Sequence, residues 1–326
     1  MMNTVLLAAG GFVPGVPISN AELTQFPADR LPLIGQKTGI EMRHYAAPGQ
    51  STSDLAIEAA RRCLEQAHFP ADGLDAILLA TSTPDRLIPA TAPRLQDALG
   101  ASTAFAFDLN SVCSGGLFAL HMADSLIRSG AHTHILVVAA DVYSRFLDAH
   151  DFSTAPYFGD GAAAVLLAGE GSEAEKGILG TYLRTDGSRT DLIQIPGGGS
   201  RLPFNRCLTP RDLCFQMNGR AVYEFAVTSG TEAVAESLHR AGLGVEALDW
   251  MIPHQANINI CREIARRCGI REERMITNLR TRGNTASASP LLALADSWNQ
   301  VARPGQTACI VAFGGGLSYG AMVVRF

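Results

Sequence analysis

Short apolar runs separated by helical segments set the pattern of this chain, and the pattern occurs twice. Residues 53–67 have helical periodicity, and after a glycine-bearing turn a short apolar run follows at 74–80. Residues 221–241 are again helical, and a matching apolar run follows at 248–252. Because a short, fully apolar run is typical of a buried parallel strand, each unit predicts a helix followed by a core strand.

The correspondence continues further along both halves. The apolar run 135–140 resembles the run 308–313, and each is followed by a glycine-bearing turn and another apolar run. Alternating strands and helices of this kind predict an α/β fold with helix-covered sheets. We place the boundary in the polar stretch 169–176, which gives an N-terminal half of residues 1–171 and a C-terminal half of residues 172–326.

Three polar residues follow predicted strands in ways that suggest one shared pocket. Cys113 lies between a strand-like run at 105–109 and a helix predicted over 117–128. Asn284 lies at the matching place in the second half, just before a helix of small residues. His254 directly follows the predicted second-half strand, at the strand end where α/β proteins bind ligands. We therefore expect the two halves to converge on one pocket, although both turns can also serve merely as helix caps.

Composition narrows the class of protein. The chain has 326 residues, of which 47% are hydrophobic and 17% charged, enough for a large core. No apolar run is long enough to span a bilayer, and the apolar start of the chain suggests a core strand and not a signal peptide. The net charge of −5 disfavours nucleic-acid binding. Seven cysteines without close pairing argue against disulfides and a zinc site, so we expect a cytoplasmic protein without a metal.

Five segments resemble the β-ketoacyl-acyl-carrier-protein synthase III family, in that family's order. The segments 108–116, 253–257 and 283–285 resemble its nucleophile, histidine and asparagine segments. The segments 159–162 and 313–316 match its structural and oxyanion-hole turns. The resemblance covers essentially the whole chain and implies a thiolase-like α/β fold, five-layered as α-β-α-β-α and built from two duplicated halves. It also implies a homodimer, an acyl carrier protein as partner and no cofactor.

The residues of these segments suit a condensing enzyme. Cys113 can store an acyl group as a thioester, and a place at a helix start is expected to favour its thiolate, although a buried structural cysteine is the plainer alternative. The resemblance implies that His254 and Asn284 hold the carbonyl of a malonyl thioester and stabilise the enolate that forms as carbon dioxide leaves. We nominate the N–H groups of Cys113 and Gly315 as the oxyanion hole.

Departures from the family concern the acyl donor. Leu33 and Lys37 stand where the family has a tryptophan and an arginine that grip coenzyme A, and Lys37 can still meet a phosphate. Phe152 and Asn259 replace two further arginines. Acetyl-coenzyme A is therefore a doubtful donor, and an acyl-carrier-protein or an unusual acyl-coenzyme A is a plausible one.

Other positions concern the acyl chain and the carrier protein. Ile88 replaces a phenylalanine that the family contributes across the dimer, so a longer or branched acyl group is expected to fit. Asn257 is a further expected substrate contact. Arg266 and Arg267 match a basic pair that receives the acidic carrier protein, although a solvated helix face explains each arginine nearly as well.

Other functions fit the same residues less well. A papain-like protease also orders Cys, His and Asn, but its nucleophile lies near the amino terminus in a different segment, so we reject it. An acyltransferase on the same scaffold would move the acyl group from Cys113 to an alcohol or amine, and the retained Asn284 argues moderately against it. A catalytically silent scaffold subunit would be expected to lose Cys113 or its partners.

Overall fold

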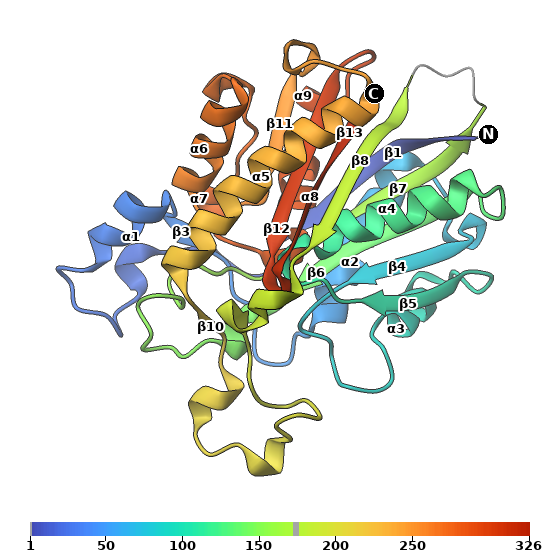
Figure 1. Ribbon diagram of the computed structural model, residues 1–326. Helices are drawn as coiled ribbons and strands as arrows, with labels where there is room; N and C mark the ends of the chain where they lie inside the picture. The colour runs from blue at the N-terminus through green and yellow to red at the C-terminus, as the bar shows by residue number, and fades with distance from the viewer. Residues whose placement is uncertain (1, 172–175) are drawn as a thin grey trace.

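Two β-sheets face each other at the centre of the computed structural model, which describes residues 2–171 and 176–326 (Figure 1). The first sheet has the strand order β1-β7-β6-β4-β5, and the second has the order β11-β12-β13-β8. The strands of the first sheet are β1 (Asn3–Phe12), β4 (Ala76–Ala80), β5 (Phe105–Leu109), β6 (His134–Asp141) and β7 (Gly161–Glu170). The strands of the second are β8 (Gly177–Thr185), β11 (Trp250–Pro253), β12 (Thr307–Gly314) and β13 (Ser318–Arg325).

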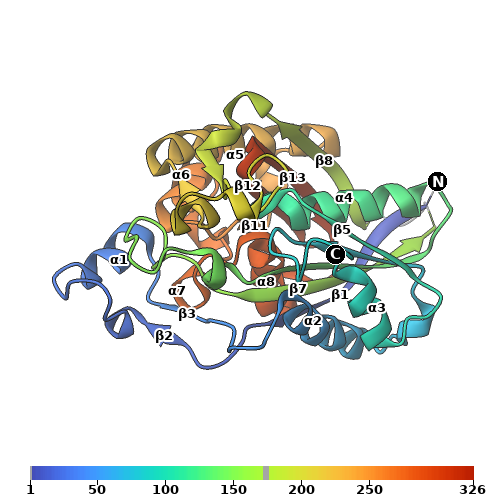
Figure 2. The same cartoon turned by 90° about the horizontal axis from the view of Figure 1, so that it is seen from below.

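Helices fill the three layers outside and between the sheets. The central layer consists of α4 (Gly115–Arg128) and α8 (Ser289–Asp296), whose buried side chains pack on the inner faces of both sheets. The outer helices are α2 (Thr52–Ala67) and α3 (Ala92–Leu99) on the first sheet, and α5 (Gly219–Ala241) and α6 (Ile258–Cys268) on the second. Figure 2 shows the same arrangement from below. The predicted five-layered α-β-α-β-α fold is confirmed.

The continuous apolar run of β6 follows from burial on both sides of the sheet. Ile135 and Val137 face the central helices, whereas Leu136 and Val138 face α2. All four side chains are fully buried. Since burying one aliphatic side chain stabilises a fold by about 1.5–3 kcal/mol, such strands anchor the residues that follow them.

The two sheets repeat the same topology. The order β1-β7-β6-β4 corresponds to β8-β13-β12-β11. In each set the first two pairs are antiparallel and the third is parallel. β5 is the additional strand of the first sheet, beside β4. The predicted division into halves at residues 171 and 172 falls at the edge of residues 172–175, which lie outside the described residues, so this boundary stays a prediction.

A segment of the first half packs against the second half. Helix α1 (Leu31–Thr38) lies beside α6, and β3 (Met42–Arg43) lies beside α7 (Leu279–Arg282). The remaining short elements are β2 (Ile18–Ser19), β9 (Ile193–Gln194), β10 (Gln216–Met217) and α9 (Trp298–Val301). Among the described residues, no helix is both long enough and apolar enough to cross a membrane.

Candidate active site

Cys113 lies in a short 3₁₀ turn directly before α4, where the chain leaves the first sheet. The preceding residue, Val112, has a left-handed backbone with φ of 46°, which is strained for a β-branched side chain. The Cys113 side chain is only 5% exposed. Gly314, at the carboxyl end of β12, covers it so closely that a Cβ on Gly314 would lie 2.8 Å from the Cβ of Cys113. The nucleophile candidate is therefore enclosed between the two sheets.

His254 follows β11 and is fixed by the start of α8. Its backbone N–H donates to Val311 O at 2.7 Å, and its ring packs edge-on against Phe313 at 5.1 Å. Its Nδ1 contacts the Oγ of Ser289, which also accepts a hydrogen bond from the backbone N–H of Gln255 at 3.1 Å. Because Nδ1 is the available acceptor for the Ser289 hydroxyl proton, this geometry favours the tautomer with a proton on Nε2.

Asn284 is held with its amide nitrogen free to donate. Its Oδ1 accepts a hydrogen bond from the backbone N–H of Ala286 at 3.0 Å, which fixes which end of the amide faces the chain. The backbone N–H of Asn284 donates to Tyr157 O at 2.9 Å, and the carbonyl of Asn284 accepts a hydrogen bond from the Gly159 N–H at 3.0 Å. Gly283 has φ of 67° in this turn, so glycine suits the position before Asn284.

Cys113, His254 and Asn284 line one cavity of about 280 Å³. The predicted convergence of the two halves is therefore observed. Asn257 also borders this cavity, at the start of α6. The remaining wall is largely apolar and aromatic, and it includes Tyr157, Phe158, Ile193, Phe215, Val222, Tyr223, Phe225, Ile260 and Phe313. A largely apolar cavity with a few polar groups, among them Cys113, suits a ligand with an apolar chain and a polar reactive end.

The expectation that a helix start favours the Cys113 thiolate is not supported. Burial, and to a smaller extent the charge of Asp141, raises the pKa of Cys113 to about 12. A pKa raised in this way favours the neutral thiol at physiological pH. Burial also lowers the pKa of His254 to about 3, so the imidazole is neutral at physiological pH.

The matching position of Cys113 in the second half is Ser287, not Asn284. Val112 and Ala286 both have left-handed backbones, with φ of 46° and 48°, and each begins a 3₁₀ turn that leads into a central helix. Cys113 and Ser287 are the next residues. The sequence-based match of Cys113 with Asn284 was wrong by three positions. It paired the two polar residues of the turns, whereas the backbone conformations pair Cys113 with Ser287.

The other predicted site residues are dispersed around the cavity. Gly315 lies beside Val112: a Cβ added to Gly315 would be 3.1 Å from Val112 Cγ2. The glycine that lies directly against Cys113 is Gly314. Lys37 is exposed, and its carbonyl accepts hydrogen bonds from the side chains of Asn257 at 3.1 Å and Asn259 at 2.9 Å. Asn257 therefore ties α1 to the mouth of the cavity.

Like Gly315 and Lys37, three further predicted residues do not line the cavity. Ile88 is 85% exposed on a loop. Arg266 and Arg267 lie in the last turn of α6, and both are paired with Glu263 at 2.8 Å. Two arginines facing one glutamate leave an excess of one positive charge on this helix end.

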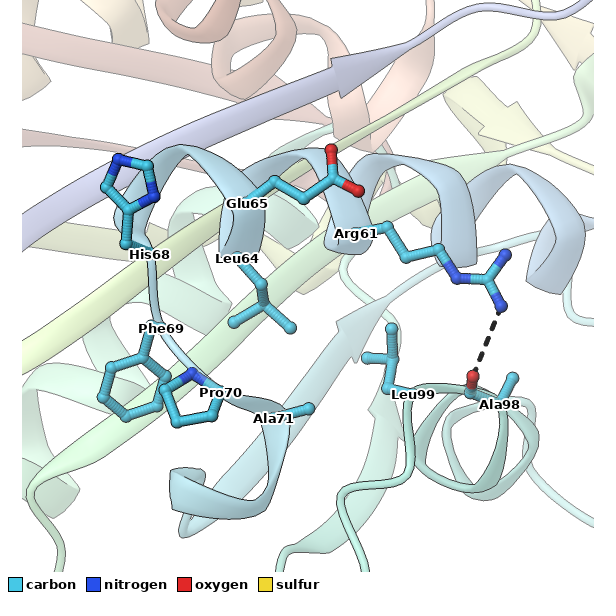
Figure 3. Close-up of a pocket in the computed structure, with 9 residues that line it drawn as sticks. All are labelled: Arg61, Leu64, Glu65, His68, Phe69, Pro70, Ala71, Ala98 and Leu99. Atoms are coloured by element: carbon cyan, nitrogen blue, oxygen red, sulfur yellow. Dashed lines mark hydrogen bonds between the residues drawn. The ribbon is translucent and has the colours of Figure 1, made fainter.

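Sequence reasoning missed the residues that fix the catalytic side chains. Ser289 is ordinary in the sequence, and only the tertiary fold places it against His254. Gly314 lies in the segment 313–316, but only the fold shows that it lies against Cys113. Asp141 gave a usable signal, since it ends an otherwise apolar strand. A separate groove between the ends of α2 and α3 (Figure 3) is bordered by Leu64 and Leu99, and the three site residues do not line it.

Comparisons with known proteins agree with this geometry. The family descriptions 3-oxoacyl-(acyl-carrier-protein) synthase III and its C-terminal part match residues 107–187 and 238–326. The chain is similar to β-ketoacyl-(acyl-carrier-protein) synthase III of Rhodospirillum rubrum, with 41% identity over 100% of both chains. It is also similar to the enzyme of that name from Cereibacter sphaeroides, with 39% identity over 100% of this chain and 99% of the relative.

A solved structure extends the likeness to the fold. The crystal structure of 3-oxoacyl-(acyl carrier protein) synthase III from Pseudomonas aeruginosa superposes with a TM-score of 0.90 at 35% identity, covering 99% of this chain and 98% of that one. The duplicated five-layered fold and its enclosed cysteine define a condensing enzyme of the thiolase type. The chain belongs to the β-ketoacyl-acyl-carrier-protein synthase III family. The predictions of this family and of an acyl-transferring enzyme are confirmed.

Proposed function

We propose that this enzyme condenses an acyl group held on Cys113 with malonyl-acyl-carrier protein, releasing carbon dioxide and a β-ketoacyl-carrier product. The observation that carries the proposal is the shared cavity of Cys113, His254 and Asn284. A nucleophile that stores the acyl group and two donors that hold a second thioester are the parts this reaction needs.

The first half-reaction loads the enzyme. The sulfur of Cys113 attacks the carbonyl of an acyl thioester, and the carbon–sulfur bond to the donor then breaks. The proton of the Cys113 thiol leaves with the departing donor thiolate, so the exchange is balanced. The N–H groups of Cys113 and Gly315 are the proposed donors to the tetrahedral oxyanion. The close approach of Gly314 to the backbone and Cβ of Cys113 supports this, because it brings the end of β12 beside Cys113.

The second half-reaction forms the carbon–carbon bond. His254 Nε2–H and the Asn284 amide donate to the thioester oxygen of the malonyl group, which carries the negative charge of the enolate as carbon dioxide leaves. The enolate carbon attacks the Cys113 thioester, the bond to sulfur breaks, and the thiolate takes up a proton. Both donors are neutral and fixed before substrate binds, so little reorganisation is needed.

The orientation of Asn284 favours condensation over acyl transfer to an alcohol or amine. Its Oδ1 is occupied by the Ala286 N–H, so the amide nitrogen is the group left to donate. A second donor beside His254 serves a developing enolate. Transfer to an alcohol or amine would instead need a base, and Asn284 offers none.

Substrate and carrier contacts are proposed at the cavity mouth. Asn257 and Lys37 are joined there, and the exposed Lys37 side chain suits a phosphate. Arg266 and Arg267 lie on the helix that starts at the mouth, and their excess positive charge suits an acidic carrier protein.

A homodimer is proposed across the open edge of β5. Phe105 and Phe107 on this strand are 41% and 36% exposed, and Met122 on α4 is 47% exposed. A row of exposed apolar side chains along a strand edge suits pairing with a second copy. The exposure of Ile88 supports its proposed contribution to the partner's acyl pocket. The seven free cysteines support a reducing, cytoplasmic setting.

The test is intact-mass analysis after incubation with a panel of acyl-coenzyme A and acyl-carrier-protein thioesters, followed by malonyl-carrier protein. We expect one donor class to give an adduct on the wild-type enzyme and none on Cys113→Ala. Asn284→Ala is expected to form the adduct but to discharge it far more slowly. Discharge to an added alcohol or amine, with the malonyl-carrier protein unchanged, would favour the acyltransferase instead.

A further inference from the structure

Asp141 is a fully buried carboxylate that the reaction described above does not use. It ends β6 and is 0% exposed. Its Oδ1 accepts hydrogen bonds from Ser82 N at 2.9 Å, Ser82 Oγ at 3.0 Å, Thr83 Oγ1 at 3.1 Å and Thr81 Oγ1 at 3.3 Å. Its Oδ2 accepts from Ser287 N at 3.0 Å and Ser287 Oγ at 2.5 Å. The carboxylate thus joins the ends of two first-half strands to the start of the second central helix.

The hydrogen-bond pattern favours a charged carboxylate. Each oxygen of Asp141 receives a backbone N–H, from Ser82 or from Ser287, and these groups can only donate. Burial raises the pKa of Asp141 overall, against the hydrogen bonds from Ser287 and Ser82, which act to lower it. No salt bridge to Asp141 is found among the described residues, so its charge is not cancelled by a basic side chain.

Ser287 brings this contact to the catalytic centre. It occupies the position in the second half that Cys113 occupies in the first, and it is three residues from Asn284. A Cβ on Gly116 would lie 2.8 Å from Ser287 O, and one on Gly115 would lie 3.5 Å from Ser287 Cβ. Ser287 therefore packs directly on the helix start that follows Cys113, with the Asp141 carboxylate behind it.

Asp141 also acts electrostatically on Cys113, from behind Ser287. The described titratable groups around Cys113 are Asp141 after β6, Tyr143 in the following turn, His254 after β11, and Tyr157 and Tyr223 in the cavity wall. Burial raises the pKa of Tyr143 well above 10 and lowers that of His254 to about 3, so both are neutral near pH 7. A buried negative charge beside a thiol disfavours the thiolate.

We propose that Asp141 and Ser287 form a positioning pair that sets the Asn284 segment against Cys113, and that the Asp141 charge keeps Cys113 protonated in the resting enzyme. The proposal rests on the proposed function, because it assigns the two residues to the malonyl half-reaction of that function. Ser287 serves the malonyl half-reaction through Asn284. Asp141 serves it through Ser287 and in addition sets the charge state of the nucleophile.

The first test compares the two half-reactions in Ser287→Ala. We expect the rate of adduct formation on Cys113 to stay within about twofold of wild type, and the discharge by malonyl-carrier protein to fall about tenfold, the loss typical of one hydrogen bond to a charged group. The matched control is Ser237→Ala, because Ser237 is equally buried and its hydroxyl bonds Val234 O at 3.0 Å in α5. This control is expected to leave both rates unchanged.

The second test is the pH profile of Cys113 alkylation by iodoacetamide in Asp141→Asn. Removing the charge should move the profile to lower pH, whereas Ser287→Ala, which keeps the charge, should leave it in place. An unmoved profile in Asp141→Asn, or wild-type discharge in Ser287→Ala, would overturn the proposal. If the wild-type adduct is itself not discharged by malonyl-carrier protein, the proposed function fails, and this outcome is distinct from the other two.

Discussion

Gly314 lies directly against Cys113, so that a Cβ on Gly314 would come within 2.8 Å of both the Cβ and the backbone nitrogen of the nucleophile. The two residues belong to different halves of the chain, at the end of β12 and before α4. Their contact closes the catalytic centre from the side of the second sheet. The space for substrate at Cys113 therefore depends on a glycine at position 314.

Gly314→Ala is expected to displace Cys113. Overpacking of this kind costs about 1–3 kcal/mol of unfolding free energy. Since a small displacement of a nucleophile lowers its rate steeply, we expect acylation of Cys113 to fall by about tenfold or more. Denaturant unfolding and adduct formation measure the two effects. Gly199→Ala is the control, because nothing lies within 4 Å of a Cβ there. Equal behaviour of the two variants would contradict the close contact.

Alkylation of Cys113 should be slow at neutral pH. Burial and Asp141 raise its pKa to about 12, so the thiolate fraction, and with it the alkylation rate, should rise about tenfold for each pH unit up to the limit of stability. Peptide-level mass analysis separates Cys113 from the other six cysteines. A rate that levels off near pH 7 would mean that the helix dipole, and not burial, sets the charge of this thiol.

His254 should make the fold less stable as the pH falls below about 6.5. Its folded pKa is lowered from 6.5 to about 3, so the unfolded chain takes up a proton in this window while the folded one does not. Stability contributed in this way is present above 6.5 and is lost as the pH falls toward 3. Between pH 6.5 and 5, wild type should lose roughly 1–2 kcal/mol more than His254→Asn. Parallel stability curves from urea unfolding would show that His254 titrates normally.

Ser289→Ala should impair the malonyl half-reaction. It removes the hydroxyl that contacts His254 Nδ1, and with it the preference for a proton on Nε2. We expect discharge of the Cys113 adduct to slow about tenfold while adduct formation is unchanged. Ser297→Ala, at the other end of α8, removes a hydroxyl bonded to Ala293 O and serves as the control. Slowing of both half-reactions alike would indicate a structural defect instead.

Arg266→Glu tests the proposed carrier-protein contact. The KM for malonyl-carrier protein should rise, and the difference from wild type should shrink at high salt, because exposed charges are screened over about 10 Å. Arg61→Glu is a matched control: Arg61 pairs with Glu58 at 3.1 Å with the same three-residue spacing as Arg266 and Glu263. It lies on α2, at the groove of Figure 3. A similar rise in KM for both variants would show that the carrier protein does not bind specifically at α6.

The repeated strands were predictable because strands that are buried on both faces consist of continuous apolar runs, which are visible in the sequence. The run 135–140 was predicted as a strand and lies within β6, whose two faces are both covered. The run 308–313 lies within β12 for the same reason. The strand predicted at 105–109 coincides with β5. Continuous apolar runs of this length have few other ways to be buried.

The charge of Cys113 was not predictable from its place before a helix. Its pKa depends on how completely the second half covers it, through Gly314, and on Asp141, which is 28 residues further along the chain. The equivalence of Cys113 and Ser287 was likewise hidden, since it rests on the backbone angles of Val112 and Ala286. Motifs indicated the candidate site residues, whereas tertiary packing determines their burial and their hydrogen-bond partners.

The most direct test of the account is a single turnover in which enzyme acylated on Cys113 is isolated, mixed with malonyl-carrier protein and followed by intact mass of both proteins. The account predicts that the enzyme returns to its free mass while the carrier protein loses carbon dioxide and gains the acyl group, in equal amounts. An adduct that persists, or that is lost while the carrier protein stays malonylated, would contradict condensation at Cys113.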